Sequence, residues 1–350
     1  MKSIVLVLGA GASKEVGLPI GTELKSEIAR LLDIRFQDGL KKQSGDCQVI
    51  EALRLIASNA EDQPGQINPY QRMCWWIRDA MPQAISIDNF IDCHVDEPKI
   101  AVCGKLAIAR AILAAEAKST LIVDKTNIRN KLDFVKNSET WFNSFFQRLT
   151  ENCGVEDLPA RLRSVGVITF NYDRCFEHYL FNAIQNYYGV PPEKSAALLE
   201  SLEIHHPYGM VGGLPWMRRP PSIYFGADVH VSELVAVSRQ LRTFTEGTNP
   251  NVSDIESIRA TVSGARTLAF LGFAFHRLNM ELLFGAASSG ATKPTQALFG
   301  SALGISPRKC LVIANKLSAH TGLSNGQMQL RNDLTCATLF QEYSDDLSLV

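Results

Sequence analysis

The chain has 350 residues, of which 46% are hydrophobic, and a formal net charge of −1. This length allows one large domain or two smaller ones, and the near-neutral charge does not favour nucleic acid as a direct partner. The eight cysteines are scattered without a C-x-x-C pair, so neither a zinc ribbon nor a disulfide framework is readable and no metal is expected. The first residues lack the features of a signal peptide, and no apolar run is long enough to cross a membrane. We therefore expect a soluble, cytoplasmic protein without a membrane partner.

The first 32 residues read as a strand, a glycine turn and a helix. Residues 4–8 form an unbroken apolar run, typical of a buried parallel strand, and residues 22–32 have helical spacing. Between them, backbone N–H groups and the start of a helix can cradle a phosphate, since glycines allow the backbone to approach it closely. The candidate ligand-binding residues of this turn are Gly9, Ala10, Gly11, Ala12, Ser13, Gly17 and Pro19.

This turn departs from the dinucleotide fingerprint Gly-x-Gly-x-x-Gly, because Lys14 stands at the third glycine position. Asp33 is followed by polar sequence over residues 35–47, where we predict no strand. An ordinary Rossmann dehydrogenase is therefore a poor fit.

A mostly helical block follows, up to about residue 150. Apolar spacing predicts helices over residues 49–57, 73–81 and 100–117, and an apolar helix face over 141–149. Within the block, the segment Ser86-Ile87-Asp88-Asn89-Phe90 is either a helix cap or a functional acidic segment. The residues leave these two interpretations open.

An α/β pattern occupies the rest of the chain. Predicted strands cover residues 167–170, 202–205, 222–225, 267–271, 310–313 and 335–340. One helix is predicted to begin near Arg174, and another begins at the capping box of Ser253 and Glu256 and ends near Gly264. Strands alternating with helices predict a doubly wound, mostly parallel, Rossmann-like sheet with an inserted helical block.

Three later segments carry side chains suited to chemistry at strand ends, where ligands of open α/β sheets bind. The first is Thr169-Phe170-Asn171-Tyr172-Asp173, which by itself is also a plausible helix cap. The second holds the neighbouring residues His205 and His206. In the third, Gly272 allows a close backbone approach, and Asn279 either contacts a ligand or caps the next helix.

Four segments of the chain, in this order, resemble those of the SIR2-like proteins of the sirtuin superfamily, and more closely those of bacterial anti-phage defence systems. They are Gly-Ala-Gly-Ala-Ser with Gly-Leu-Pro, the Thr-x-Asn-x-Asp segment, the histidine segment and the Gly272 segment. The resemblance implies that the glycine loop binds NAD⁺, with Gly272, Phe273 and Asn279 on the adenosine side. It implies that Asn171 holds the ribose next to nicotinamide or the attacking water. It implies that Asp173 lies near the nicotinamide or orients the loop, and that a histidine is the base.

Three departures from true sirtuins bear on the activity. Ile20-Gly21-Thr22 replaces the Asp-Phe-Arg that follows Gly-x-Pro, the four-cysteine zinc module is missing, and Pro207 and Tyr208 separate His206 from Gly209. The first two speak against acyl-lysine chemistry and leave NAD⁺ binding intact. The third leaves the choice of base between His205 and His206.

We favour His206 as the base. Neighbouring residues of a strand point to opposite faces, so the two histidines should not both reach one ribose. Pro207 holds His206 extended and ends the strand directly after it, at the carboxyl edge of the sheet. His205 is expected to be a packed, hydrogen-bonded structural residue.

The resemblance predicts an NAD⁺ glycohydrolase, with NAD⁺ as substrate, that depletes NAD⁺ during phage infection. The alternatives are a non-catalytic NAD or ADP-ribose sensor and, less favoured, a protein deacylase. We expect one SIR2-like domain over residues 1–350, with an α/β core of 1–32 and 160–350 and a helical insertion of 45–150. We also expect a homo-oligomer, with an ATPase or nuclease of the same operon as a possible partner, and the preference between NAD and NADP stays open.

Overall fold

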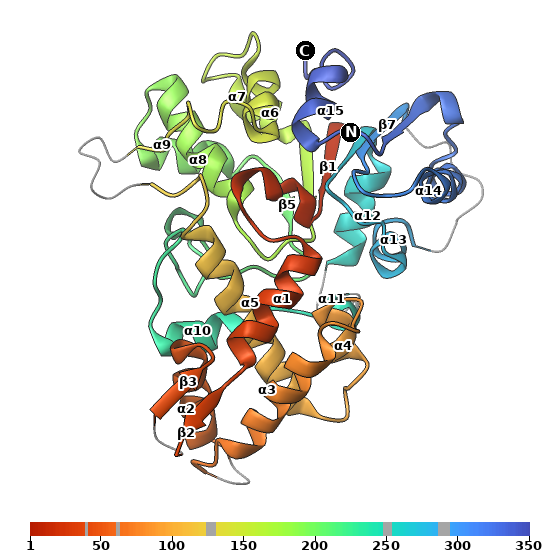
Figure 1. Cartoon of the computed structure of the whole chain (residues 1–350). Coiled ribbons are helices and arrows are strands. Elements are labelled where there is room, and N and C mark those ends of the chain that lie inside the picture. The colour runs from red at the N-terminus through yellow and green to blue at the C-terminus, as the bar shows by residue number, and fades with distance from the viewer. Residues whose placement is uncertain (39–40, 61–63, 124–130, 248–253, 286–294) are drawn as a thin grey trace.

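The computed structural model describes residues 1–38, 41–60, 64–123, 131–247, 254–285 and 295–350 (Figure 1). A parallel sheet of six strands forms its centre, in the order β5-β4-β1-β6-β7-β8. These strands are β1 (Lys2–Leu8), β4 (Val165–Thr169), β5 (Glu203–His205), β6 (Ala265–Leu271), β7 (Ala297–Ser301) and β8 (Met328–Arg331). The predicted α/β, Rossmann-like class is confirmed.

The apolar first strand lies in the middle of this sheet. β1 pairs in parallel with β4 on one side and β6 on the other, with Val7 opposite both Ile168 and Phe270. Its side chains alternate between the two faces, so Val5 and Val7 enter one hydrophobic core while Leu6 and Leu8 enter the other. Both faces are therefore buried, which is why the sequence reads as an unbroken apolar run.

Helices cover both faces of the sheet, as a doubly wound fold requires. One core includes residues of α1 (Gly21–Leu32), α12 (Ile255–Ser263), α13 (Arg277–Phe284) and α14 (Pro307–Thr321). The other includes residues of α6 (Trp141–Thr150), α7 (Leu158–Arg163), α8 (Cys175–Tyr188), α9 (Pro192–Leu199) and α15 (Cys336–Glu342).

A second group of helices extends beyond the sheet, at the lower end of Figure 1. It is built around α5 (Pro98–Glu116), which packs against α1, α2, α3, α4 and α10. The remaining members are α2 (Cys47–Ser58), α3 (Asn68–Ala80), α4 (Ile87–Asp92), α10 (Val231–Ser238) and α11 (Phe244–Gly247). Among the described helices we find none with both the length and the hydrophobicity needed to span a bilayer.

Residues 35–47 differ from the prediction of a strandless stretch. They contain β2 (Arg35–Gln37) and β3 (Lys41–Ser44), which pair antiparallel in a separate small sheet. The side chains of this ribbon are polar and largely exposed apart from Phe36, so the sequence lacks the apolar alternation by which strands are recognised. The ribbon adds no strand to the central sheet.

Three predicted strands are wrong. Residues 222–225 are not a strand, because the carbonyls of Ile223 and Tyr224 accept hydrogen bonds from the buried guanidinium of Arg174. Residues 310–313 belong to α14, and residues 335–340 lie largely in α15, whose first turn is capped by the Thr335 hydroxyl. Both segments have an apolar run too short to separate a strand from a buried helix turn.

The actual edge strands β7 and β8 were missed, since β7 contains Gly300 and β8 alternates with polar residues. At the predicted capping box, Ser253 lies outside the described residues. The cap of α12 that is described is Asp254, whose carboxylate accepts from the Ser257 N–H.

Candidate functional site

The order of the strands places a topological switch point between β1 and β6. The chain runs from β1 to β4 on one side of the sheet and from β6 to β7 on the other, so the direction of winding reverses between these two central strands. In open α/β sheets, ligands bind at such a switch point, beyond the carboxyl ends of the strands. The loop after β1 begins at Gly9 and the loop after β6 begins at Gly272.

These two loops are interlocked through their glycines. The N–H of Gly11 donates to the carbonyl of Gly272 at 3.0 Å. A Cβ added to Gly272 would lie 2.1 Å from the Ala12 nitrogen, and one added to Gly9 would lie 2.6 Å from the Gly272 oxygen. Packing of one loop against the other therefore requires these glycines, whether or not a pyrophosphate also approaches them.

We expect Gly272→Ala to destabilise the fold by several kcal/mol. The residue has φ +57°, which costs an L-residue about 1–2 kcal/mol, and the new methyl overlaps the backbone of Gly11 and Ala12. Gly304→Ala is the matched control, since Gly304 has φ +80° but no atom within 4 Å of the added Cβ. Urea unfolding of both variants measures the difference, and an equal loss of stability would contradict the interlock.

A buried polar cluster lies beside the interlocked loops. The Asn171 Nδ2 donates to the Gly9 carbonyl at 3.1 Å and to the Ser13 hydroxyl at 3.2 Å. The Ser13 hydroxyl donates to Asp173 Oδ1 at 3.0 Å, and this oxygen also accepts from the Cys175 N–H at 3.1 Å. The structure thus brings four predicted site residues together, Gly9 and Ser13 from the loop after β1 and Asn171 and Asp173 from the end of β4. Asp173 caps the start of α8 at the same time.

The cluster is closed to solvent in this structure. Ser13, Asn171 and Asp173 are 3%, 7% and 7% exposed. Burial, reinforced by the charge of Glu116, raises the pKa of Asp173 to about 6, although its hydrogen bonds oppose the shift. Among the described residues, the hydrogen bonds of the Asn171 side chain are donated by Nδ2, which leaves Oδ1 available to accept from a ligand hydroxyl.

Sequence reasoning missed a buried ion pair directly behind this cluster. Arg174 and Glu116, both fully buried, lie 2.5 Å apart. The same guanidinium donates to the carbonyl of Ile223 at 2.6 Å. The pair fastens the start of α8 to the end of α5, and no sequence spacing links two positions that far apart.

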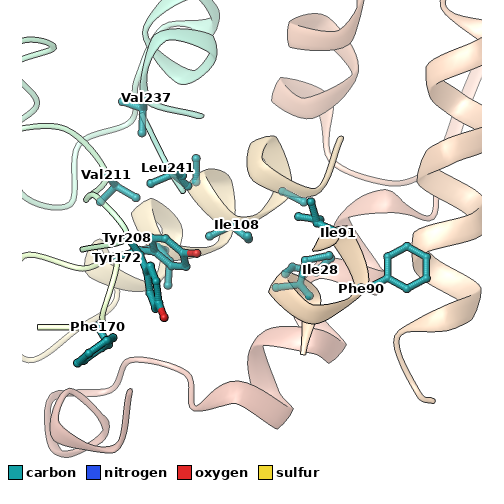
Figure 2. Close-up of a cluster of buried hydrophobic side chains, with 14 of the residues drawn as sticks. Ile28, Phe90, Ile91, Ile108, Phe170, Tyr172, Tyr208, Val211, Val237 and Leu241 are labelled. Atoms are coloured by element: carbon teal, nitrogen blue, oxygen red, sulfur yellow. The ribbon is translucent and has the colours of Figure 1, made fainter. Parts of the chain in front are cut away.

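The acidic segment at residues 86–90 caps a helix and also holds a residue of the Asn171 segment. The Ser86 hydroxyl accepts from the Asn89 N–H and caps α4. Asp88 instead accepts a hydrogen bond from the Tyr172 hydroxyl, so its carboxylate holds the residue between Asn171 and Asp173. Figure 2 shows the ring of Tyr172 next to that of Tyr208, among side chains that include Ile108 of α5.

Asp88 should make the protein less stable as the pH rises. Burial raises its pKa from 3.8 to about 6, so between these values the folded chain binds more protons than the unfolded chain and a higher pH favours unfolding. The raised pKa of Asp88 lowers the free energy of unfolding by about 3 kcal/mol, and this loss is complete above about pH 6. Asp88→Asn should reduce the fall in the free energy of unfolding between pH 4 and 7 by this amount and leave the part due to Asp173, while Asp96→Asn, at an exposed aspartate, should keep the whole fall. Parallel wild-type and Asp88→Asn profiles would contradict the assignment.

The remaining predicted loop residues have structural environments. Gly17 has φ +95°, in the left-handed region, at the end of a short 3-10 turn. Ala12, which is buried, accepts from the Trp141 indole N–H through its carbonyl. Pro19 and Ala10 lie on the less buried side of the same loop, and Lys14 is exposed and paired with Glu23.

On the β6 side, Phe273 packs among aromatic rings rather than facing solvent. Asn279 lies inside α13 and accepts from the Tyr208 hydroxyl at 2.5 Å, so it is not the cap of that helix. The Asn279 side chain is buried, and its described contact is to protein.

The two histidines have different environments. His205 lies on β5, and its Nε2 is 2.8 Å from Glu203, a carboxylate that also pairs with Lys2. His206 follows the strand, and its Nε2 is 2.5 Å from the buried carboxylate of Glu177 on α8. Among the described residues we find no hydrogen-bond partner for the buried His206 Nδ1.

His206 lines a cavity of about 680 Å³. The described residues that line it belong to α5 and to segments 206–220 and 239–246, and do not include Ser13, Asn171 or Asp173. The structure therefore joins the glycine loop, Asn171 and Asp173 in one cluster and sets His206 beside a cavity of its own. Glu177 is a further candidate residue that the sequence did not reveal.

We compared the chain with known protein families, with curated proteins and with solved structures, and none of the three comparisons found a match.

Proposed function

We propose that the chain is an NAD⁺ glycohydrolase that releases nicotinamide and ADP-ribose. The observation that carries the proposal is the meeting of three segments at the switch point of the sheet: the glycine loop after β1, the Gly272 loop after β6, and Asn171 at the end of β4. NAD⁺ is the substrate in this proposal, and no metal takes part.

The reaction makes modest demands on the protein. When the bond between ribose and nicotinamide breaks, its electron pair neutralises the pyridinium ring, and positive charge develops on the ribose. The protein must orient the ribose and direct a water molecule to it. Asn171 would orient the ribose or the water through Oδ1, while Asp173 acts as a positioning residue that holds Ser13 and, through it, the Asn171 amide.

In this proposal, a ribose oriented by Asn171 extends toward the cavity that His206 lines, where His206 takes the proton of the attacking water. The Glu177 carboxylate accepts from the His206 Nε2–H, which leaves Nδ1 as the basic nitrogen. Nδ1 is buried and has no partner among the described residues, so it can take a proton from a water that enters the cavity beside His206.

Hydrolysis without control would exhaust the NAD⁺ of the cell. The proposal therefore includes control by assembly: a homo-oligomer, gated by an ATPase or nuclease partner, that acts as an antiviral effector. A non-catalytic sensor of NAD or ADP-ribose is the second candidate. It is favoured by the separation of the proposed base His206, which lines its own cavity, from the Asn171 cluster.

One experiment tests both candidates. Purified protein is incubated with NAD⁺ and, separately, with NADP⁺, and the products are resolved by chromatography. Release of nicotinamide with ADP-ribose supports the glycohydrolase. Binding of NAD⁺ or ADP-ribose in calorimetry without nicotinamide release, both alone and with the proteins of the neighbouring genes added, supports the sensor, and the absence of both binding and release under both conditions contradicts the two together.

A further inference from the structure

The cavity beside His206 is distinct from the cluster at the switch point. Its walls come from α5, from the loop after β5 that continues past Pro220, and from the segment joining α10 to α11. At about 680 Å³ it lies within the usual range of small-molecule sites, about 300–1,000 Å³.

Most of the charged side chains that line the cavity are basic. Lys105, Arg219, Arg239 and Arg242 contribute four positive charges, against one carboxylate, Glu246, which is 2.6 Å from Lys105. In the described part of the chain, no hydrogen bond or ion pair of the Arg219 or Arg239 guanidinium is found. The whole chain carries a net charge of −1, so this concentration of positive charge is local.

A buried polar group with an unused nitrogen adds a second observation. The His206 side chain is only 5% exposed and lines the cavity, and its Nδ1 has no partner among the described residues. Leaving such an atom unsatisfied costs free energy, which a ligand or water that enters the cavity can recover.

The backbone holds the basic walls in place. Gly209 packs so closely that an added Cβ would lie 2.5 Å from the Gln240 carbonyl, and one on Gly213 would lie 2.6 Å from that of Arg219. The Gln240 side chain donates to the Pro220 carbonyl at 2.8 Å. These contacts tie the segment of Arg219 to the segment of Arg239 and limit the ordering cost of binding.

We propose that this cavity binds a small molecule through its phosphate groups. Arginine presents paired N–H donors that match phosphate oxygens, and two or more arginines around one cavity suit a diphosphate. This binding site is additional to the proposed hydrolysis, because a phosphate compound can bind in the cavity without NAD⁺ being cleaved. The diphosphate belongs either to NAD⁺ itself or to a separate phosphorylated compound.

Inorganic pyrophosphate is the probe. By calorimetry at low salt, it should bind the full-length wild-type protein, and its affinity should fall as the salt concentration rises. Arg219→Ala and Arg239→Ala should each weaken binding about tenfold, and the double variant should weaken it further. Arg308→Ala removes the same charge from an exposed position on α14 and should bind like the wild type.

Further measurements separate the sources and the sites. If saturating NAD⁺ displaces pyrophosphate, and the arginine variants also weaken NAD⁺ binding, the diphosphate is that of NAD⁺; independent binding indicates a separate compound. Absence of pyrophosphate binding to the wild type, or unchanged binding in the double variant, overturns the proposal. Loss of binding in Ser13→Ala, with binding retained in the arginine variants, also overturns the proposal, because it would place the phosphate at the glycine loop.

Discussion

Asn171→Ala should remain folded and lose NAD⁺ cleavage by about three orders of magnitude. Its amide joins the Gly9 carbonyl to Ser13, and its Oδ1 is the atom left to accept from the substrate. Truncation removes the ribose contact and releases the glycine loop at the same time, so orientation of the ribose and of the water should fail together. The lost hydrogen bonds should lower the free energy of unfolding by about 1–3 kcal/mol.

The measurement is nicotinamide release by wild type and variant at equal concentration, with melting curves for both. Asn182→Ala is the matched control, because the Asn182 amide also donates to a backbone carbonyl, that of His178, but lies on α8 away from the cluster. The control should retain wild-type turnover. A folded Asn171→Ala protein with wild-type turnover would remove Asn171 from the mechanism.

The sequence revealed those elements of the fold that a single local pattern is enough to identify. β1, β4 and β6 are buried on both faces and therefore read as continuous apolar runs. The glycine loop and the Asn171 segment follow two of these strands, and parallel neighbours end at the same edge of a sheet. Their meeting could be predicted for that reason.

The sequence could not reveal contacts between distant segments. Glu15 accepts from the N–H groups of both Trp141 and Ala337, so one carboxylate of the glycine loop caps two helices. Glu177 reaches His206 from another element, and no periodicity marks that pairing. Pocket shape is equally hidden, which is why the separation between His206 and the Asn171 cluster emerged only from the structure.

His206→Ala should be folded and inactive, with a loss of roughly 10²–10⁴-fold, whereas His205→Ala should keep most of its activity. His205 is engaged by Glu203 within a surface ion-pair group, while His206 is held by a buried carboxylate that fixes its orientation. The two alanine variants are compared for nicotinamide release, with melting curves as the folding control. If His205→Ala is instead the folded, inactive variant, the assignment of the base is wrong.

Glu177→Gln tests whether the carboxylate positions His206. Glutamine can still accept from the His206 Nε2–H, so the ring should keep its orientation and turnover should fall only about tenfold. Because the neutral amide no longer stabilises the charge that the imidazole gains with the proton, kcat should fall while KM changes little. Glu177→Leu removes the acceptor as well and should approach the loss seen in His206→Ala. A purely structural role would lower the melting temperature of both variants and leave the kcat of the folded fraction unchanged.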